Sequence, residues 1–224
     1  LFRGDDPLPN AVETVTTLVR EGAKVAYVTN NSGAPRDVLR EKLAGMGFPV
    51  SLDQCWGSAD AAAAHCIAKG YRRVFVVGEP GLMRTLEAAG LELVQDQPDV
   101  LVAGVCSALT YDWIDRALQV LLAGVPFVAT NTDSTYPLEG GRLRPGAGAT
   151  IGALIGCAGV QPHVVGKPAS DLMHLVMEAN LVNRDETLIV GDRLETDIEA
   201  GRNAGCDTFL MLTGVTTEPA PGQA

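Results

Sequence analysis

The sequence predicts an α/β fold with a parallel β-sheet, and three observations support this. Short apolar runs alternate with amphipathic, helix-type runs along most of the 224 residues. Such alternation is typical of βαβ units with helices on the faces of a sheet. The apolar runs are continuous, as expected for strands buried on both faces. Three of the runs end in polar residues, and ligands bind beyond the carboxyl ends of parallel strands.

The two kinds of run, apolar and amphipathic, predict the strands and helices in order along the chain. The apolar, β-type runs predict strands at 23–30, 72–78, 99–105, 125–131, 186–192 and 207–212. The runs rich in Ala, Leu, Glu and Arg predict helices at 10–21, 35–46, 58–69, 80–89, 112–123, 148–158, 168–179 and 194–204. The middle section has its own strand–helix alternation and a glycine-rich stretch at 139–141. We therefore expect a separate unit there.

Composition and charge narrow the class of protein. Hydrophobic residues make up 46% and charged residues 20%, which is ordinary for a globular protein. The net charge of -10 disfavours nucleic acid and anionic membrane surfaces as partners. No apolar run approaches the roughly 20 residues needed to span a bilayer. The five cysteines form no CxxC pattern, which favours a reducing, cytoplasmic location. The three histidines show no metal-binding spacing, so none is predicted to be a ligand.

The first polar cluster follows the predicted strand 23–30. Thr29, Asn30, Asn31 and Ser32 precede Gly33 and offer hydroxyl and N–H donors that can hold a phosphate oxygen. The alternative is that Ser32 or Asn31 caps the helix predicted at 35–46. Taken alone, the pattern favours the cap. Both roles are compatible, because capping and anion binding use the same kind of donor.

The second cluster is a lysine at a helix start. Lys167 lies between Gly166 and Pro168, and proline is favoured at the first position of a helix. An ammonium group at the positive end of a helix is unfavourable unless an anion is also present. The alternative, a solvated loop lysine, is equally consistent with the pattern by itself.

The third cluster is acidic. Asp192 ends the predicted strand 186–192, and Asp197 follows five residues later. Carboxylates that converge at a strand end suit Mg²⁺, which prefers oxygen ligands. Asp192 can also cap the helix that follows.

Together, the three clusters occur in the motif order of a known family. The chain resembles the haloacid dehalogenase superfamily of phosphohydrolases, in the branch of nitrophenylphosphatase-like and phosphoglycolate-phosphatase-like enzymes. Its second, third and fourth motifs are matched by VTNNS (28–32), GKP (166–168) and GDRLETDI (191–198). Its cap region is matched by VVGEPGL (76–82), ATNTD (129–133) and RPGAG (144–148). The resemblance covers essentially the whole chain.

This resemblance implies a Rossmann-like parallel-sheet core and an inserted α/β cap. The core corresponds to residues 1–70 and 161–224, expected to be truncated at both ends, and the cap to residues 71–160. In this branch the cap decides which substrate is bound. The resemblance also allows a homodimer formed through the cap. Asn131 and Asp133 are expected either to lie at the cap–core hinge, to reach the site, or to form a turn.

The resemblance also implies an activity. It is the Mg²⁺-dependent hydrolysis of a small phosphorylated metabolite (a sugar phosphate, phosphoglycolate or nucleotide) through an aspartyl phosphate. Thr29 and Lys167 are the implied catalytic residues, which bind the phosphoryl group and neutralise its charge. Asp192 and Asp197 are the implied metal-binding residues. The implied phosphate- or substrate-binding residues are Thr29, Asn30, Asn31, Lys167, Arg193, Leu194, Glu195 and Thr196.

The nucleophile of that family is not found. Its motif DxDG belongs at the end of a first strand, just before a segment like Leu1–Gly4. Asp5 and Asp6 precede Pro7, which indicates a turn. The strand itself belongs between the strands near 24–30 and 187–192, so we expect two unpaired edges there.

We therefore expect a fragment of an active phosphatase, itself inactive as written. The alternative is a non-catalytic phosphate-ligand binder or scaffold protein on the same fold. An unrelated nucleotide-binding protein is disfavoured, because neither GxGxxG nor a P-loop occurs.

Overall fold

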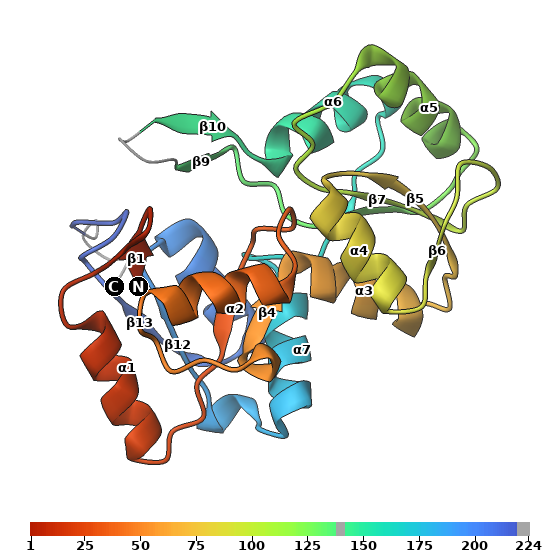
Figure 1. Ribbon diagram of the computed structural model, residues 1–224. Helices are drawn as coiled ribbons and strands as arrows, with labels where there is room; N and C mark the ends of the chain where they lie inside the picture. The colour runs from red at the N-terminus through yellow and green to blue at the C-terminus, as the bar shows by residue number, and fades with distance from the viewer. Residues whose placement is uncertain (138–141, 219–224) are drawn as a thin grey trace.

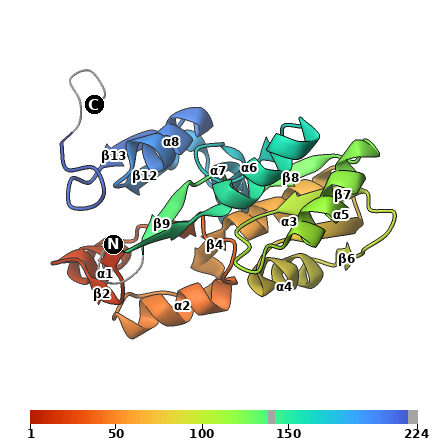
Figure 2. The same ribbon diagram turned by 90° about the horizontal axis from the view of Figure 1, so that it is seen from above.

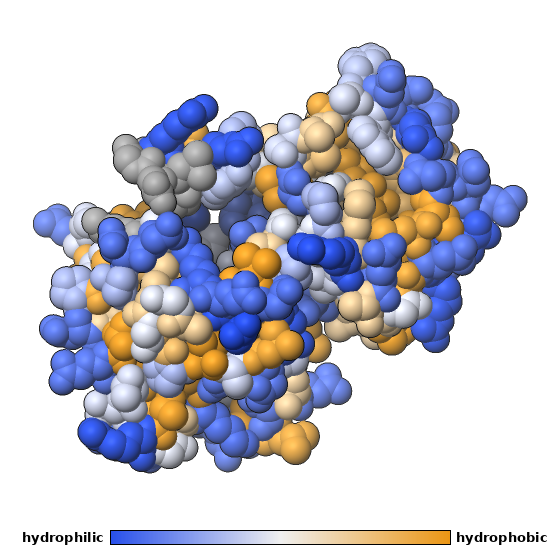
Figure 3. Space-filling model, in the orientation of Figure 1, coloured by the Kyte–Doolittle hydropathy of each residue, from blue (hydrophilic) through white to orange (hydrophobic). Residues whose placement is uncertain are grey.

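The computed structural model describes residues 1–137 and 142–218. The chain forms two parts (Figure 1), one holding both terminal segments and the other holding the middle of the chain. The glycine-rich stretch 139–141 lies outside the described residues. None of the helices in the described ranges is long and apolar enough to cross a membrane. On the face drawn in Figure 3, hydrophilic side chains cover most of the surface, with apolar patches on both parts.

A five-stranded parallel sheet forms the centre of the second part. Its strand order is β11–β8–β7–β5–β6. The strands are β5 (Arg73–Val77), β6 (Glu92–Leu93), β7 (Val100–Ala103), β8 (Phe127–Ala129) and β11 (His163–Val164). All four residues of β7 are buried, as expected when helices cover both faces of a sheet. The parallel α/β fold predicted from the sequence is confirmed.

Alternate residues of the strands supply two separate cores. Val74 and Val76 of β5 pack on one face with α3 (Ser58–Ala68) and α4 (Pro80–Ala88). Phe75 and Val77 point to the opposite face, which α5 (Tyr111–Leu122) and α6 (Ala147–Ala158) cover. This division follows from the two-residue period of a β-strand.

The other part contains two short parallel pairs of strands. Tyr27–Thr29 (β3) pairs with Cys55–Gly57 (β4), and Leu188–Gly191 (β12) pairs with Asp207–Leu210 (β13). The helices of this part are α1 (Ala11–Arg20), α2 (Arg36–Gly45), α7 (Asp171–Asn180) and α8 (Glu199–Ala204). Short 3-10 turns lie at Leu52–Gln54 and Arg184–Glu186. Helix α3 packs against both α4 and α7 and so connects the two parts (Figure 2).

The two parallel pairs do not join into one sheet within the described residues. On β12 and β13, three apolar side chains of one face are more than half exposed: Leu188 (57%), Val190 (57%) and Phe209 (55%). Val190 lies opposite Phe209 in the strand register. The expectation of unpaired strand edges between β3 and β12 agrees with this pairing.

Two antiparallel hairpins complete the fold. Phe2–Arg3 (β1) pairs with Asp6–Pro7 (β2), which agrees with the turn expected around Asp5 and Asp6. Thr135–Pro137 (β9) pairs with Leu143–Pro145 (β10), and Figure 1 shows this second hairpin extending away from the five-stranded sheet.

Two predicted helices differ in the structure. The helix expected at 168 begins at Asp171. Pro168 instead lies in a turn, closed by a 3.0 Å hydrogen bond from Ala169 N to Gly166 O. The helix expected over 194–204 is a π-helical turn at Leu194–Ile198 followed by α8. Both differences fall next to the polar clusters, where side chains compete with the regular helix for backbone groups.

Candidate functional site

The segment after β3 is shaped by its own side chains. Asn31 N donates a hydrogen bond to Thr29 Oγ1 at 3.1 Å, and Gly33 N donates to Asn31 Oδ1 at 2.9 Å. Helix α2 then begins after Pro35 with no side-chain cap. The expectation that Ser32 or Asn31 caps this helix is therefore wrong. Thr29 Oγ1 uses a lone pair in its bond, so its O–H remains able to donate to an anion.

Asn30 holds the backbone of Lys167 next to the end of β3. Its Nδ2 donates to Lys167 O and its Oδ1 accepts from Lys167 N, both at 2.9 Å. The two residues are 137 positions apart in the chain. Asn30 Nδ2 also lies 3.2 Å from Asp133 Oδ2. The side chain of Asn30 thus positions the lysine-bearing loop.

A second set of contacts fixes Asn30 itself. Its carbonyl oxygen accepts hydrogen bonds from Ser58 Oγ and Asn131 Nδ2, both at 2.7 Å. Asn131 Oδ1 in turn accepts from Asp133 N at 3.1 Å. Asn131 therefore forms a turn and also reaches the site, which are two of the three roles expected for it. Ser58 was missed because it follows β4, a strand of three residues that shows no clear apolar run.

Lys167 and Asp197 form a buried ion pair. Lys167 Nζ lies 2.6 Å from Asp197 Oδ1, and the two side chains are only 13% and 12% exposed. The other carboxylate oxygen, Oδ2, accepts from the backbone N–H groups of Asp192 and Arg193, each at 3.2 Å. Asp197 therefore links the lysine loop to the end of β12.

The surroundings of Asp197 favour its ionised form. Burial by itself raises the pKa of this carboxyl group. The Lys167 ammonium and the three hydrogen bonds to the carboxylate outweigh burial and hold the pKa below its ordinary value. Asp197 is thus a carboxylate at neutral pH, and its charge balances that of Lys167.

Gly191 allows Asp197 to approach β12 this closely. A Cβ atom at Gly191 would overlap the Cβ and carboxylate of Asp197. Asp197 comes from the π-helical turn, where Asp197 N donates to Arg193 O at 2.9 Å. Such turns occur frequently at functional sites.

Asp192 follows β12 directly and contacts the segment near the C-terminus. Its Oδ2 accepts from Val215 N at 2.7 Å, and its carbonyl oxygen accepts from Thr216 N at 3.0 Å. Arg193 lies beside it with a buried Nε that has no hydrogen-bond partner in the described structure. A buried donor without a partner is costly, so Arg193 Nε is a candidate donor to a bound anion.

The structure brings together most of the residues singled out from the sequence. Contacts run from Asn30 to Lys167, from Lys167 to Asp197, and from Asp197 to the backbone of Asp192 and Arg193. Leu194, Glu195 and Thr196 lie on the π-helical turn, and their part in binding phosphate stays a prediction. Chemically, the site offers an ammonium group, hydroxyl and amide donors, and the three carboxylates of Asp133, Asp192 and Asp197.

Comparison with known proteins gives matches over most of the chain. Residues 1–92 match the family model described as haloacid dehalogenase-like hydrolase, and residues 164–223 match the HAD-hydrolase-like model. The 5'-nucleotidase YutF of Bacillus subtilis is 36% identical over 217 residues, which are 96% of this chain and 84% of that protein.

Two solved structures have a fold similar to that of this chain. The p-nitrophenyl phosphatase from Archaeoglobus fulgidus has a TM-score of 0.88 at 37% identity, covering 94% of this chain and 81% of its own. The glycerol phosphate phosphatase Rv1692 from Mycobacterium tuberculosis, in complex with magnesium, has a TM-score of 0.87 at 34% identity. That match covers 96% of this chain and 65% of the other.

Proposed function

Because this chain belongs to the haloacid dehalogenase-like hydrolases, in the nitrophenylphosphatase-like branch, we propose a phosphohydrolase site for small organic phosphomonoesters. The proposed reaction type is Mg²⁺-dependent hydrolysis through an aspartyl phosphate, and none of the site's carboxylates is assigned as its nucleophile. One observation carries the proposal: Lys167 and Asp197 form a buried pair that the loops after β3 and β12 both hold in place.

Lys167 and Thr29 are proposed to bind the transferring phosphoryl group. The Lys167 ammonium is largely shielded from water, so its attraction for a phosphate oxygen is stronger than at the surface. The hydroxyl of Thr29 donates to a second oxygen, and the N–H groups after β3 add further donors. Arg193 Nε is a third candidate, because it has no protein partner in the described structure.

The acidic residues suit a hard divalent cation. Asp192 and Asp197 offer carboxylate oxygens at the end of β12, which is the ligand type that Mg²⁺ prefers. Both oxygens of Asp197 already accept hydrogen bonds, so we assign the direct contact to Asp192 and a supporting role to Asp197. A bound Mg²⁺ supplies positive charge that balances the phosphate.

Three carboxylates in this site already have partners. Asn30 contacts Asp133, Val215 N donates to Asp192, and Lys167 pairs with Asp197. Each of them is thus assigned to a hydrogen bond, an ion pair or the metal, and no DxDG motif occurs in the sequence, so we propose that the 224 residues bind phosphate without transferring it. The same observation favours a second candidate function, that of a phosphate-ligand binding or scaffold protein on this fold.

Measuring both phosphate binding and substrate turnover distinguishes a phosphatase from a phosphate-ligand binding protein. The 224-residue chain is expected to bind inorganic phosphate with Mg²⁺ present, by calorimetry, and to release no p-nitrophenol from p-nitrophenyl phosphate. A chain extended at its N-terminus by a strand ending in Asp-x-Asp-Gly is expected to hydrolyse that substrate. Binding without turnover in the extended chain supports the scaffold function, and Mg²⁺-dependent turnover by the 224 residues refutes the predicted inactivity.

A further inference from the structure

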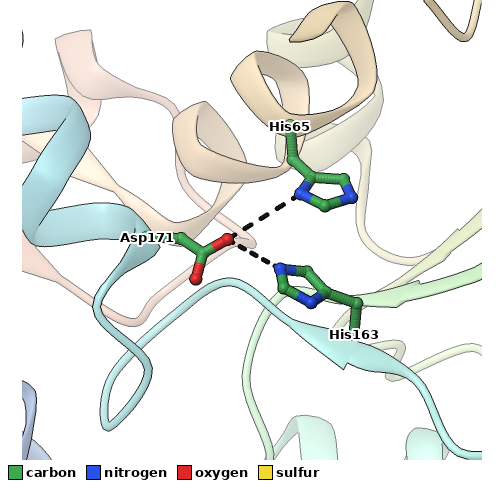
Figure 4. A group of neighbouring side chains, drawn as sticks. All are labelled: His65, His163 and Asp171. Carbon is green, nitrogen blue, oxygen red and sulfur yellow. Dashed lines mark hydrogen bonds and ion pairs between the residues drawn. The ribbon is translucent and has the colours of Figure 1, made fainter. Parts of the chain in front are cut away.

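A cluster of metal-ligating side chains lies outside the phosphate site, at the junction of the two parts. It contains His65 on α3, His163 on β11 and Asp171 at the start of α7 (Figure 4). One ligand atom from each residue lies within 4.8 Å of the others. The sequence gives no such signal, because the three residues come from separate elements with irregular spacing.

The three side chains face one point. Asp171 Oδ1 lies 2.7 Å from His163 Nε2 and 3.8 Å from His65 Nδ1. Figure 4 shows both ring nitrogens directed at this carboxylate. Tetrahedral Zn²⁺, with bonds of about 2.0–2.1 Å, places its ligand atoms about 3.3 Å apart. That spacing falls between the two distances, and an ion held by all three atoms requires the two imidazole rings to rotate out of their stacked arrangement.

The donor types select the metal. Two imidazoles and one carboxylate suit zinc and its neighbours in the transition series, whereas Mg²⁺ prefers oxygen ligands alone. The side chain of His163 is 48% exposed, so an ion and a water ligand can reach the cluster from solvent.

The cluster brackets the loop that carries Lys167. His163 precedes Lys167 by four residues, and Asp171 follows it by four. His65 belongs to α3, which packs against α4 on one side and α7 on the other. An ion held by all three side chains therefore joins three elements around this loop.

We propose that His65, His163 and Asp171 form a binding site for a Zn²⁺-type transition metal, which clamps the loop 165–170 between β11 and α7. The site is separate from the proposed Mg²⁺ site and does not depend on hydrolysis. The alternative is that these residues bind no metal. His163 and Asp171 then form only a hydrogen-bonded pair, and the rings of His65 and His163 stack with their centroids 4.3 Å apart.

Zinc titration of the metal-free protein tests the site. Excess Mg²⁺ is added to occupy Asp192, and Co²⁺ serves as a spectroscopic probe of tetrahedral nitrogen and oxygen ligands. We expect one tight Zn²⁺ per chain. His163→Gln is expected to weaken binding by more than about 100-fold, because even the loss of an outer partner costs about 10–100-fold. His65→Gln is expected to act alike.

The third histidine provides a matched control. His174 lies on α7 but outside the cluster, so His174→Gln is expected to leave zinc affinity unchanged. Unfolding midpoints measured without metal check that each variant is folded, and His163 is exposed enough to be replaced safely. Wild-type affinity in a folded His163→Gln protein, or an equal loss in His174→Gln, overturns the site.

Hydrogen exchange tests the clamp. Zn²⁺ is expected to slow amide exchange in residues 165–170 of the wild-type protein and not in His163→Gln. Tight zinc binding that leaves exchange in this loop unchanged overturns the clamp.

Discussion

At the scale of single residues, the pair of Lys167 and Asp197 is the most informative contact. It is buried, it is short, and it connects two motifs that are 30 positions apart. Neither residue alone identifies a site from the sequence, since a solvated loop lysine explains Lys167 equally well and a single carboxylate such as Asp197 is not specific. Their pairing could not be predicted, because it depends on a π-helical turn where the sequence pattern indicates a regular helix.

Asp197 makes the stability of the protein depend on pH. Its folded pKa lies below its ordinary value of 3.8, so the ionised form contributes stability above that pH. This contribution is lost as the pH falls through the lower, folded value. We expect the free energy of unfolding, measured by urea titration, to fall in this acid range. In Asp197→Asn this part of the pH dependence is expected to disappear; an unchanged acid profile would contradict it.

Removing one partner of the pair is expected to cost more than removing both. Asp197→Asn leaves the Lys167 ammonium buried without a counter-charge, which typically costs about 3–5 kcal/mol. The double variant Lys167→Met/Asp197→Leu replaces the pair by apolar groups and is expected to recover most of this loss. Urea unfolding measures both. Equal losses in the single and double variants would contradict this expectation.

Asn30 is expected to act through Lys167. Asn30→Ala removes two hydrogen bonds to the Lys167 backbone, and a lost buried partner costs about 1–3 kcal/mol. Phosphate affinity is therefore expected to fall although Lys167 is still present. Calorimetric titration with phosphate checks this. The control is Asn180→Ala, whose side chain bonds within α7 to Val176 O and is expected to leave affinity unchanged.

Among the helices and strands, the positions of the longer elements could be predicted from the sequence, and those of the shortest elements could not. The helices from α1 to α6 and the strands β5, β7 and β8 follow from apolar patterns that are long enough to show a period. By contrast, β6 and β11 have two residues each and are defined only by their neighbours in the sheet. A turn at Gly166–Ala169 occupies the place of the predicted helix start. The backbone conformation around Lys167 therefore could not be predicted from Pro168.

The close packing of the π-helical turn on β12 predicts a strong effect at Gly191. Gly191→Ala places a Cβ inside the Asp197 side chain, so it is expected to destabilise the protein and to weaken Mg²⁺ binding. Gly156→Ala is the matched control, because nothing lies within 4 Å of a Cβ there. In the interior of α6 it is expected to stabilise by about 0.5–1 kcal/mol. Thermal unfolding and Mg²⁺ titration of both variants measure the difference.

At the scale of the whole molecule, the two parts differ in how completely their strands are paired. The five-stranded sheet is covered on both faces, whereas β3–β4 and β12–β13 are separate pairs within the described residues. We expect amides of β7 to exchange with solvent far more slowly than those of β12, because protection follows burial and pairing. Hydrogen exchange measured strand by strand checks this. Equal protection of β7 and β12 would contradict the separation.

Lys167 and Asp192 are proposed to belong to one site for phosphate and a divalent cation. Calorimetric titration of the 224-residue chain with phosphate, with and without Mg²⁺, tests it most directly. We predict binding that Mg²⁺ strengthens, that Lys167→Ala abolishes, and that Asp192→Asn reduces to its Mg²⁺-free level, while the exposed Lys69→Ala stays like wild type. Phosphate binding that is unaffected by both Lys167→Ala and Asp192→Asn would contradict the claim.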